Sequence, residues 1–320
     1  MTSAILSVRD LQVHFTVRGP FNRRIGSIRA VDGVSFDLMP GEVFGLVGES
    51  GCGKSTLGKT IMGIHQPTAG EIWFEGQQID RLSPAARRAV RRSLQYAYQD
   101  PGASLDPRWK IGSSLNEPLV VHTDLDAAAR EARIRSILAA VGLPDTHLDL
   151  YPHEISGGQQ RRVGLARILT LHPKVVILDE PTSGLDVSVQ ATVLALFRSL
   201  RATFALTYML ISHDLAVVRT MCSRVAVMYL GRIVETGPTD EIFERPQHPY
   251  TRSLLAAIPK IGGPRVTRNF WLQGEPPDPG NLPSGCRFRT RCPKADELCA
   301  REEPALQALA RGSVACHFPD

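Results

Sequence analysis

The sequence lacks the two features that would place a chain in a membrane or send it through one. It contains no run of roughly 20 apolar residues, the length that a membrane-spanning helix needs. Its N-terminus, MTSAILSVRD, lacks the basic-then-apolar order of a signal peptide. We therefore expect a chain that neither spans a membrane nor is exported, and that works in the cytosol.

A strong excess of charge is also missing. The net charge of +5 is small for 320 residues, and the basic residues are spread along the chain. This balance suits contact with a nucleotide, a nucleic acid or an acidic membrane surface, but it equally fits a solvated surface. With 43% hydrophobic and 22% charged residues, the composition is that of a globular protein long enough for two domains.

Cysteine is scarce and unevenly placed. Of the six cysteines, four lie close to the C-terminus, at Cys286, Cys292, Cys299 and Cys316. In a reducing compartment cysteines do not form lasting disulfides, so such a cluster indicates a metal before it indicates cross-links.

A glycine-rich loop joins a predicted strand to a predicted helix. Residues 42–47, EVFGLV, are typical of a buried strand, and LGKTIMGI beyond the loop has a helical pattern. The loop GESGCGKST matches GxxxxGK[ST], in which backbone N–H groups and the helix N-terminus hold phosphate oxygens. We expect Lys54 to contact the β- and γ-phosphates and Ser55 to ligate Mg²⁺. The predicted nucleotide-binding residues are Gly48, Glu49, Ser50, Gly51, Cys52, Gly53, Lys54, Ser55 and Thr56.

Two adjacent acids follow a second predicted strand. In KVVILDEPTSGLD, apolar residues 175–178 lead directly into Asp179 and Glu180. At the end of a buried strand one carboxylate can reach the metal through water and the other the attacking water, as phosphoryl transfer requires. An acidic turn after a core strand is the simpler alternative. Beside a phosphate loop, we favour a nucleotide-hydrolysing site.

Two further features have a phosphate-binding and a structural interpretation. His213 ends a third apolar run, where an imidazole could bond the γ-phosphate or serve only the fold. Ser156, Gly157 and Gly158 precede a strongly helical run, so a second helix N-terminus is offered to an anion. It is either a capping motif or a donor to a nucleotide held by another subunit.

Taken in order, these motifs resemble those of the ATP-binding subunits of ABC transporters, over about residues 4–260. The resemblance implies two ATPase domains that hold two ATP molecules head to tail, each between one phosphate loop and the other subunit's signature. It implies that Glu180 is the general base and that His213 organises the γ-phosphate. The motifs beyond the phosphate loop are the Q-loop residue Gln99, the signature Ser156, Gly157, Gly158 and Gln159, the acids Asp179 and Glu180, the D-loop residue Asp186, and His213.

The same resemblance assigns the cofactors. Gln99 and Asp179 would join Ser55 around Mg²⁺, with Gln99 also serving catalysis. Phe15 occupies the place of the aromatic residue that usually stacks on adenine, although Phe21 lies nearby and strand aromatics are usually core residues.

The expected fold is α/β: an ABC-type ATPase core with an N-terminal antiparallel β-subdomain, a helical subdomain and a small irregular C-terminal metal-binding extension. We expect an ATPase domain over residues 1–260, with its helical subdomain at about 83–155, and the extension over 261–320. Strands near 175–179, 206–211 and 224–230 alternate with helices, as in a parallel sheet. Residues 99–119 are either part of a socket for the membrane subunit's coupling helix or a connecting loop.

Residues 238–260, PTDEIFERPQHPYTRSLLAAIPK, resemble the C-terminal extension of the dipeptide and oligopeptide importers, a subgroup that includes nickel and glutathione importers. The resemblance implies a peptide-import ATPase on the cytoplasmic face of the cell membrane. Its partners would be a related second ATPase, two transmembrane permeases and a periplasmic or extracellular substrate-binding protein. An ATPase linked to nucleic acid is disfavoured by the single cassette with its short insert, and an exporter by the missing fused membrane domain.

The spacing of the tail cysteines bears on the metal. Five, six and sixteen residues separate them, which is a poor match to the closely spaced pairs of zinc sites. Four thiolates on an irregular loop suit a [4Fe–4S] cluster, and members of the subgroup with this tail are thought to hold one structurally. Zinc and the absence of a metal remain the alternatives.

Overall fold

The computed structural model describes residues 3–98, 101–258 and 274–320. The chain divides into two compact units. The first unit comprises residues 1–39, 43–80 and 210–320, and the second comprises residues 40–42 and 81–209. Within the described part of the chain, no helix is both long enough and apolar enough to cross a bilayer.

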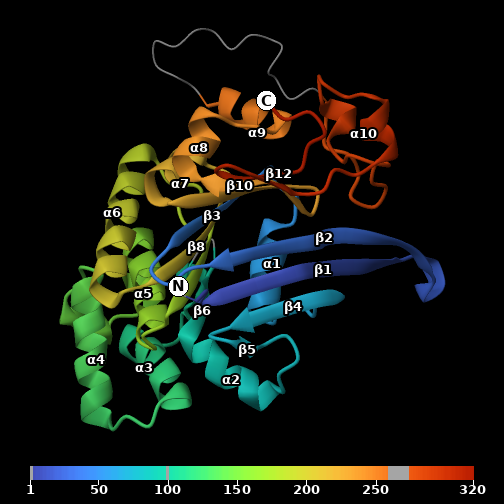
Figure 1. The fold of residues 1–320 in the computed structure, drawn as a ribbon. Coiled ribbons are helices and arrows are strands. Elements are labelled where there is room, and N and C mark those ends of the chain that lie inside the picture. The colour runs from blue at the N-terminus through green and yellow to red at the C-terminus, as the bar shows by residue number, and fades with distance from the viewer. Residues whose placement is uncertain (1–2, 99–100, 259–273) are drawn as a thin grey trace. The chain divides into compact units, whose positions relative to one another are not determined.

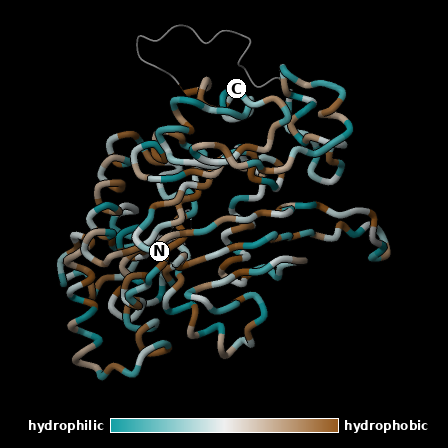
Figure 2. The backbone as a smooth tube through the Cα atoms, viewed as in Figure 1, coloured by the Kyte–Doolittle hydropathy of each residue, from teal (hydrophilic) through white to brown (hydrophobic). Residues whose placement is uncertain are grey.

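An antiparallel sheet with the strand order β2-β1-β4-β5 opens the first unit (Figure 1). Leu6, Val8, Leu11 and Val13 of β1 are buried, and Figure 2 shows hydrophobic and hydrophilic residues alternating along this hairpin. The prediction of an N-terminal antiparallel β-subdomain is confirmed. Its strands are β1 (Leu6–Arg18), β2 (Arg24–Leu38), β4 (Ala69–Phe74) and β5 (Gln77–Gln78), with the 3₁₀ turn η1 (Pro20–Asn22).

Part of a second sheet lies in the first unit and carries the phosphate loop. Strand β3 pairs in parallel with β9, with Phe44 opposite Arg224, and every residue of β3 is buried. The strand order continues from β3 through β9, β10 and β12 to β11. The elements are β3 (Val43–Val47), β9 (Arg224–Tyr229), β10 (Arg232–Pro238), β11 (Gln307–Leu309), β12 (Gly312–Val314), α1 (Lys54–Ile61), α7 (Leu215–Met221), α8 (Thr239–Glu244), α9 (Pro249–Ala256), η6 (Arg289–Arg291) and α10 (Glu297–Arg301).

The second unit contains a parallel strand pair and most of the long helices. Strands β6 and β7 pair from Leu94 opposite Val175 onward. Strand β8 (Thr207–Ser212) spans the division between the units. The elements are α2 (Pro84–Ser93), β6 (Leu94–Ala97), η2 (Pro101–Ser104), α3 (Ile111–His122), α4 (Ala127–Ala140), η3 (Asp145–Asp149), η4 (Pro152–Glu154), α5 (Gly157–Leu169), β7 (Val175–Asp179) and α6 (Val187–Phe204).

The strands predicted near 175–179, 206–211 and 224–230 are confirmed by β7, β8 and β9. Two expectations need correction. Strand β6 lies inside the stretch predicted as the helical subdomain, and it was not predicted because four residues directly after an arginine-rich helix are too few to show a strand period. The C-terminal extension is also less irregular than predicted, since β12 adds to the edge of β10, with Glu235 opposite Val314.

Candidate functional site

The phosphate loop of the first unit lies between β3 and α1. Its backbone requires glycine, since Gly48, Gly51 and Gly53 have φ values of 154°, 79° and 108°. A Cβ atom at Gly48 would lie 2.2 Å from the Met228 carbonyl oxygen, and one at Gly53 would lie 2.0 Å from that of Ala30. The backbones of β9, at Met228, and of β2, at Ala30, therefore pack so closely on the loop that no side chain fits at these two positions.

Lys54 is the first residue of α1, and its side chain turns back into the loop. The Nζ atom donates hydrogen bonds to the carbonyl oxygens of Gly48 and Glu49, at 2.7 and 2.8 Å. The ammonium group thus lies within the ring of backbone atoms that would surround a phosphate. Ser55 follows in the first helical turn, and Thr56 accepts a hydrogen bond from Thr60 at its carbonyl oxygen. Cys52 is buried, and burial raises the pKa of its thiol.

Two residues from distant parts of the chain contact Glu49, and the sequence patterns gave no sign of either. The Tyr250 hydroxyl accepts a hydrogen bond from the Glu49 N–H group at 2.9 Å. Arg291 forms a two-pronged ion pair with the Glu49 carboxylate, with N–O distances of 2.7 and 3.0 Å. A basic residue in a tail has no local pattern that would tie it to the loop.

His213 and Phe15 also belong to the first unit. His213 follows β8 and is exposed, beside Asp214, whose carboxylate caps the start of α7 by accepting from the Ala216 and Val217 N–H groups. Phe15 lies on β1 with 38% of its surface exposed, and its ring meets that of His65 edge to face at a centroid distance of 5.4 Å.

The predicted acids lie together in the second unit, at the end of β7. Asp179 is buried and accepts a 2.5 Å hydrogen bond from the Tyr96 hydroxyl on β6. Burial and the neighbouring Asp179 carboxylate raise the pKa of Tyr96, which therefore stays a donor. Glu180 has a φ of +50°, in the left-handed region that a non-glycine residue adopts at an energetic cost. The backbone therefore leaves the extended conformation of β7 at Glu180.

The signature residues begin α5. Ser156 caps the helix reciprocally with Gln159: its hydroxyl accepts from the Gln159 N–H group at 3.3 Å, and the Gln159 Oε1 atom accepts from the Ser156 N–H group at 2.8 Å. A Cβ atom at Gly157 or Gly158 would meet nothing within 4 Å, so a large anion can approach the backbone there. Beside this helix start lies a cavity of about 630 Å³, which Pro181, Leu185 and Val189 also line.

Asp186 caps α6 by accepting from the Val189 N–H group at 2.9 Å and from the Ser188 hydroxyl at 2.6 Å. The bond from the Ser188 hydroxyl, and then that from Val189, lowers the pKa of its carboxyl group. Gln99 lies outside the described residues. The remaining predicted residues fall into two groups: the phosphate loop, His213 and Phe15 in the first unit, and the acids, the signature and Asp186 in the second.

The four tail cysteines are free thiols, with Cys299 buried and the others partly exposed. The Cys286 N–H group donates to the Cys299 carbonyl oxygen at 2.8 Å. Burial, and after it the three other tail cysteines, raise the pKa of the Cys286 thiol to about 11. Within the described residues, no group of three histidine, cysteine or acidic side chains is arranged to hold a single metal ion.

Two family models match the chain. The model described as ABC transporter matches residues 31–183, which include the phosphate loop, the signature and the acids. The model described as oligopeptide/dipeptide transporter, C-terminal region, matches residues 234–299. The second match covers α9 and three of the four tail cysteines.

Similar proteins include an oligopeptide transport ATP-binding protein, AppF, of Bacillus subtilis. It is 47% identical over 98% of this chain and 97% of its own length. The dipeptide transport ATP-binding protein DppF of Escherichia coli is 44% identical over 99% of this chain and 95% of its own. Among solved structures, cbiO1 of Clostridium perfringens, part of the ABC transporter complex cbiONQ, has a TM-score of 0.66 at 29% identity, over 76% of this chain and 92% of its own. A dimeric ATP-binding cassette bound to ADP and Pi, MJ0796, shares the fold with a TM-score of 0.64 at 24% identity, over 73% and 98%.

Proposed function

Since this chain belongs to the ABC transporter ATP-binding proteins with an oligopeptide/dipeptide-type C-terminal region, we propose that it hydrolyses ATP to power the import of di- or oligopeptides. The observation that carries this proposal is the similarity to peptide transport ATP-binding proteins along almost the whole chain, including the extension. A resemblance confined to the cassette would support ATP hydrolysis without indicating a cargo.

The site residues take roles in this proposal. The phosphate loop and Lys54 hold the β- and γ-phosphates, Ser55, Asp179 and Gln99 ligate Mg²⁺, and Phe15 stacks on adenine. Glu180 activates water, with His213 at the γ-phosphate. The strained backbone at Glu180 supports its role, because such strain gathers where a side chain must be aimed.

The proposed assembly is a head-to-tail pair of ATPases on the cytoplasmic face of the membrane. The open N-terminus of α5 supports this arrangement, because its backbone can receive the phosphates of a nucleotide held by the other ATPase. The partners are a related ATPase, two permease subunits and a substrate-binding protein outside the membrane. We keep residues 1–260 as the ATPase domain, with the helical subdomain at about 83–155, and 261–320 as the extension.

We further propose that Cys286, Cys292, Cys299 and Cys316 hold a [4Fe–4S] cluster. The four free thiols support it, because the three others lie close enough to Cys286 to raise the pKa of its thiol, and a cubane takes one cysteine on each of four irons. When bound, the cluster would staple the extension. Anaerobic purification should give a brown protein with iron and sulfide; a colourless protein with stoichiometric zinc would reverse the assignment.

The assembly can be tested by purifying the tagged chain from membranes of its own organism. The proposal predicts that two permeases and a second ATPase co-purify. Recovery with DNA-repair proteins and without permeases would contradict it.

The catalytic roles are tested by Glu180→Gln. This variant should keep ATP binding and lose nearly all hydrolysis, trapping a closed dimer, because the amide cannot accept the proton of the attacking water. Hydrolysis at the normal rate would show that Glu180 is not the base.

A further inference from the structure

The C-terminal extension contacts the phosphate loop directly. We propose that Arg291 is a positioning residue for ATP binding, which fixes Glu49 and with it the loop, so that the extension is a working part of the nucleotide site. This inference rests on the proposed role of the phosphate loop, and its test separates the two.

The first contact is the ion pair between Arg291 and Glu49. The side chain of Arg291 is 4% exposed and that of Glu49 is 24% exposed, so water screens the pair weakly. The guanidinium group lies 5.9 Å from the centroid of the Tyr229 ring and 3.5 Å from its hydroxyl oxygen. Arg291 is thus held by the cassette, and its two parallel bonds fix the direction of the Glu49 carboxylate.

The backbone of Glu49 is held at the same time. Its N–H group donates to the Tyr250 hydroxyl at 2.9 Å, and its carbonyl oxygen accepts from Lys54 at 2.8 Å. Tyr250 is fully buried. Its ring packs against that of Tyr229 in β9, at a centroid distance of 4.6 Å, and against that of Phe288 in the extension, at 5.4 Å. The N–H group, the carbonyl group and the carboxylate of one loop residue therefore all have fixed partners.

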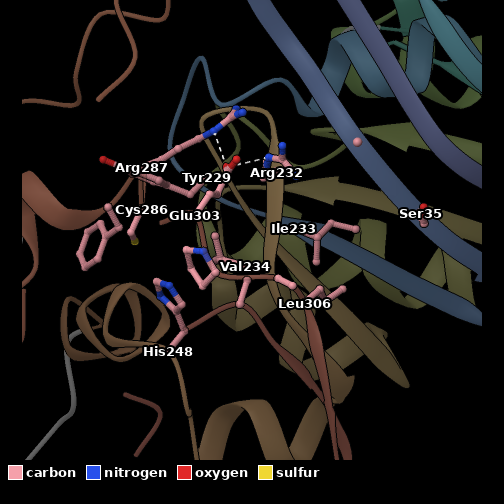
Figure 3. A pocket seen from close by; sticks show the side chains of 15 residues that line it. Ser35, Tyr229, Arg232, Ile233, Val234, His248, Cys286, Arg287, Glu303 and Leu306 are labelled. Carbon is pink, nitrogen blue, oxygen red and sulfur yellow. Dashed lines mark hydrogen bonds and ion pairs between the residues drawn. The ribbon is translucent and has the colours of Figure 1, made fainter. Parts of the chain in front are cut away.

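A second set of contacts, made by Arg287, joins the extension to residues next to the phosphate loop. Arg287 donates to the Leu230 carbonyl oxygen and pairs with Asp32. Figure 3 shows Arg287 and Arg232 both directed at Glu303, at distances of 3.0 and 2.8 Å. These charged groups neutralise one another beside a cavity of about 310 Å³ that Cys286 also lines.

The contacts of Arg287 reach the loop through backbone hydrogen bonds. Gly231, which follows Leu230, donates its N–H to the Cys52 carbonyl oxygen at 2.9 Å. Gly231 in turn accepts from the Asp32 N–H group at 2.9 Å. Leu230, which Arg287 binds, precedes Gly231 in the chain, and Asp32, which Arg287 also binds, donates to Gly231. Arg287 is therefore linked through Gly231 to Cys52 of the phosphate loop.

The physical consequence concerns binding more than chemistry. Without Arg291, the Glu49 carboxylate loses its cation within a loop that must bind an anion, and its direction is no longer fixed. Repulsion between the carboxylate and phosphates then weakens ATP binding. The proposed chemical step belongs to Glu180 and His213, which are not members of this pair, so the rate at saturating ATP should change little.

The test is a double-mutant cycle on the full-length chain, with the Kd for Mg-ATP and the Michaelis parameters as readouts. Arg291→Gln should weaken Mg-ATP binding between about twofold and thirtyfold, the range expected when a coupling contact is removed. It should raise KM and leave kcat within about twofold. In a Glu49→Gln background the same change should have little further effect, because the partner charge is already gone.

The matched control is Arg301→Gln, which removes an exposed arginine of the same extension whose ion pair is with Glu297, in the same helix α10. It should bind Mg-ATP as the unmodified chain does. If Arg291→Gln fails to fold, Tyr250→Phe removes only the hydroxyl at Glu49 and should raise the Kd less, by about threefold. The inference would be overturned if folded Arg291→Gln bound Mg-ATP with unchanged affinity. It would also be overturned if Arg291→Gln and Glu49→Gln had independent effects on the Kd.

Lys54→Ala separates this inference from the proposed function. Loss of ATP binding in Lys54→Ala with normal binding in Arg291→Gln would refute the role of Arg291 alone. Normal binding in Lys54→Ala would refute the phosphate loop as the nucleotide site.

Discussion

Acidification should destabilise the first unit through His248, the N-cap residue of α9. His248 is 1% exposed, and its Nδ1 atom accepts a hydrogen bond from the Tyr250 N–H group at 3.0 Å. Burial lowers the pKa of the imidazole from 6.5 to about 4. The folded protein therefore keeps this side chain neutral at pH values where the unfolded chain protonates it.

The sign and size of the effect follow from this difference. Stability is fully present above pH 6.5 and is lost progressively as the pH falls toward about 4, because the unfolded state binds the proton first. Between pH 7.5 and pH 5 the loss is about 2 kcal/mol for a single group with these two pKa values. Glu235 accepts from the His248 N–H group, and burial raises its pKa, so it offsets part of the loss at the acidic end.

The assay is urea unfolding of the chain and of His248→Asn over this pH range, followed by far-ultraviolet circular dichroism. Asparagine does not titrate, and its side-chain oxygen can still cap α9. The variant should lose about 2 kcal/mol less stability than the unmodified chain on acidification, with Glu235 present in both. Equal losses in the two proteins would refute the assignment to His248.

Two further substitutions test other parts of the site. Tyr96→Phe removes the hydrogen bond to buried Asp179. It should lower the free energy of unfolding by about 1.5 to 3 kcal/mol, the contribution of a hydrogen bond to a charged group. The midpoint of urea unfolding measures this change, and an unchanged midpoint would contradict the prediction. Phe15→Ala should weaken ATP binding about tenfold if the ring stacks on adenine. Phe21→Ala, at a fully exposed position, should leave ATP binding unchanged. Titration with a fluorescent ATP analogue compares the two variants, and equal affinities would contradict the stacking of Phe15 on adenine.

Much of the fold could be predicted because its central strands are continuous apolar runs. Every residue of β3, β7 and β8 is buried, and each run ends beside a turn or a polar residue that the sequence makes plain. Strand β6 was not predicted because it has only four residues and directly follows helix α2. Its pairing with β7 is a tertiary property, which local sequence does not encode.

The candidate site divides in the same way. The phosphate loop could be predicted because close backbone contacts demand glycine at Gly48 and Gly53, and this demand leaves a pattern in the sequence. The ion pair between Arg291 and Glu49 could not be predicted, since the two residues are separated by 242 positions. An ion pair at that separation has no period, so only the folded chain reveals that the extension belongs to the nucleotide site.

Peptide uptake by the assembled transporter tests the central claim most directly. Proteoliposomes with the co-purified permeases, both ATPases and the binding protein would be given a labelled dipeptide outside and Mg-ATP on the side of the ATPases. We predict uptake together with phosphate release for the unmodified chain, and neither for an assembly with Glu180→Gln. Uptake at the normal rate with Glu180→Gln, or ATP hydrolysis that no peptide and no binding protein alters, would contradict the account.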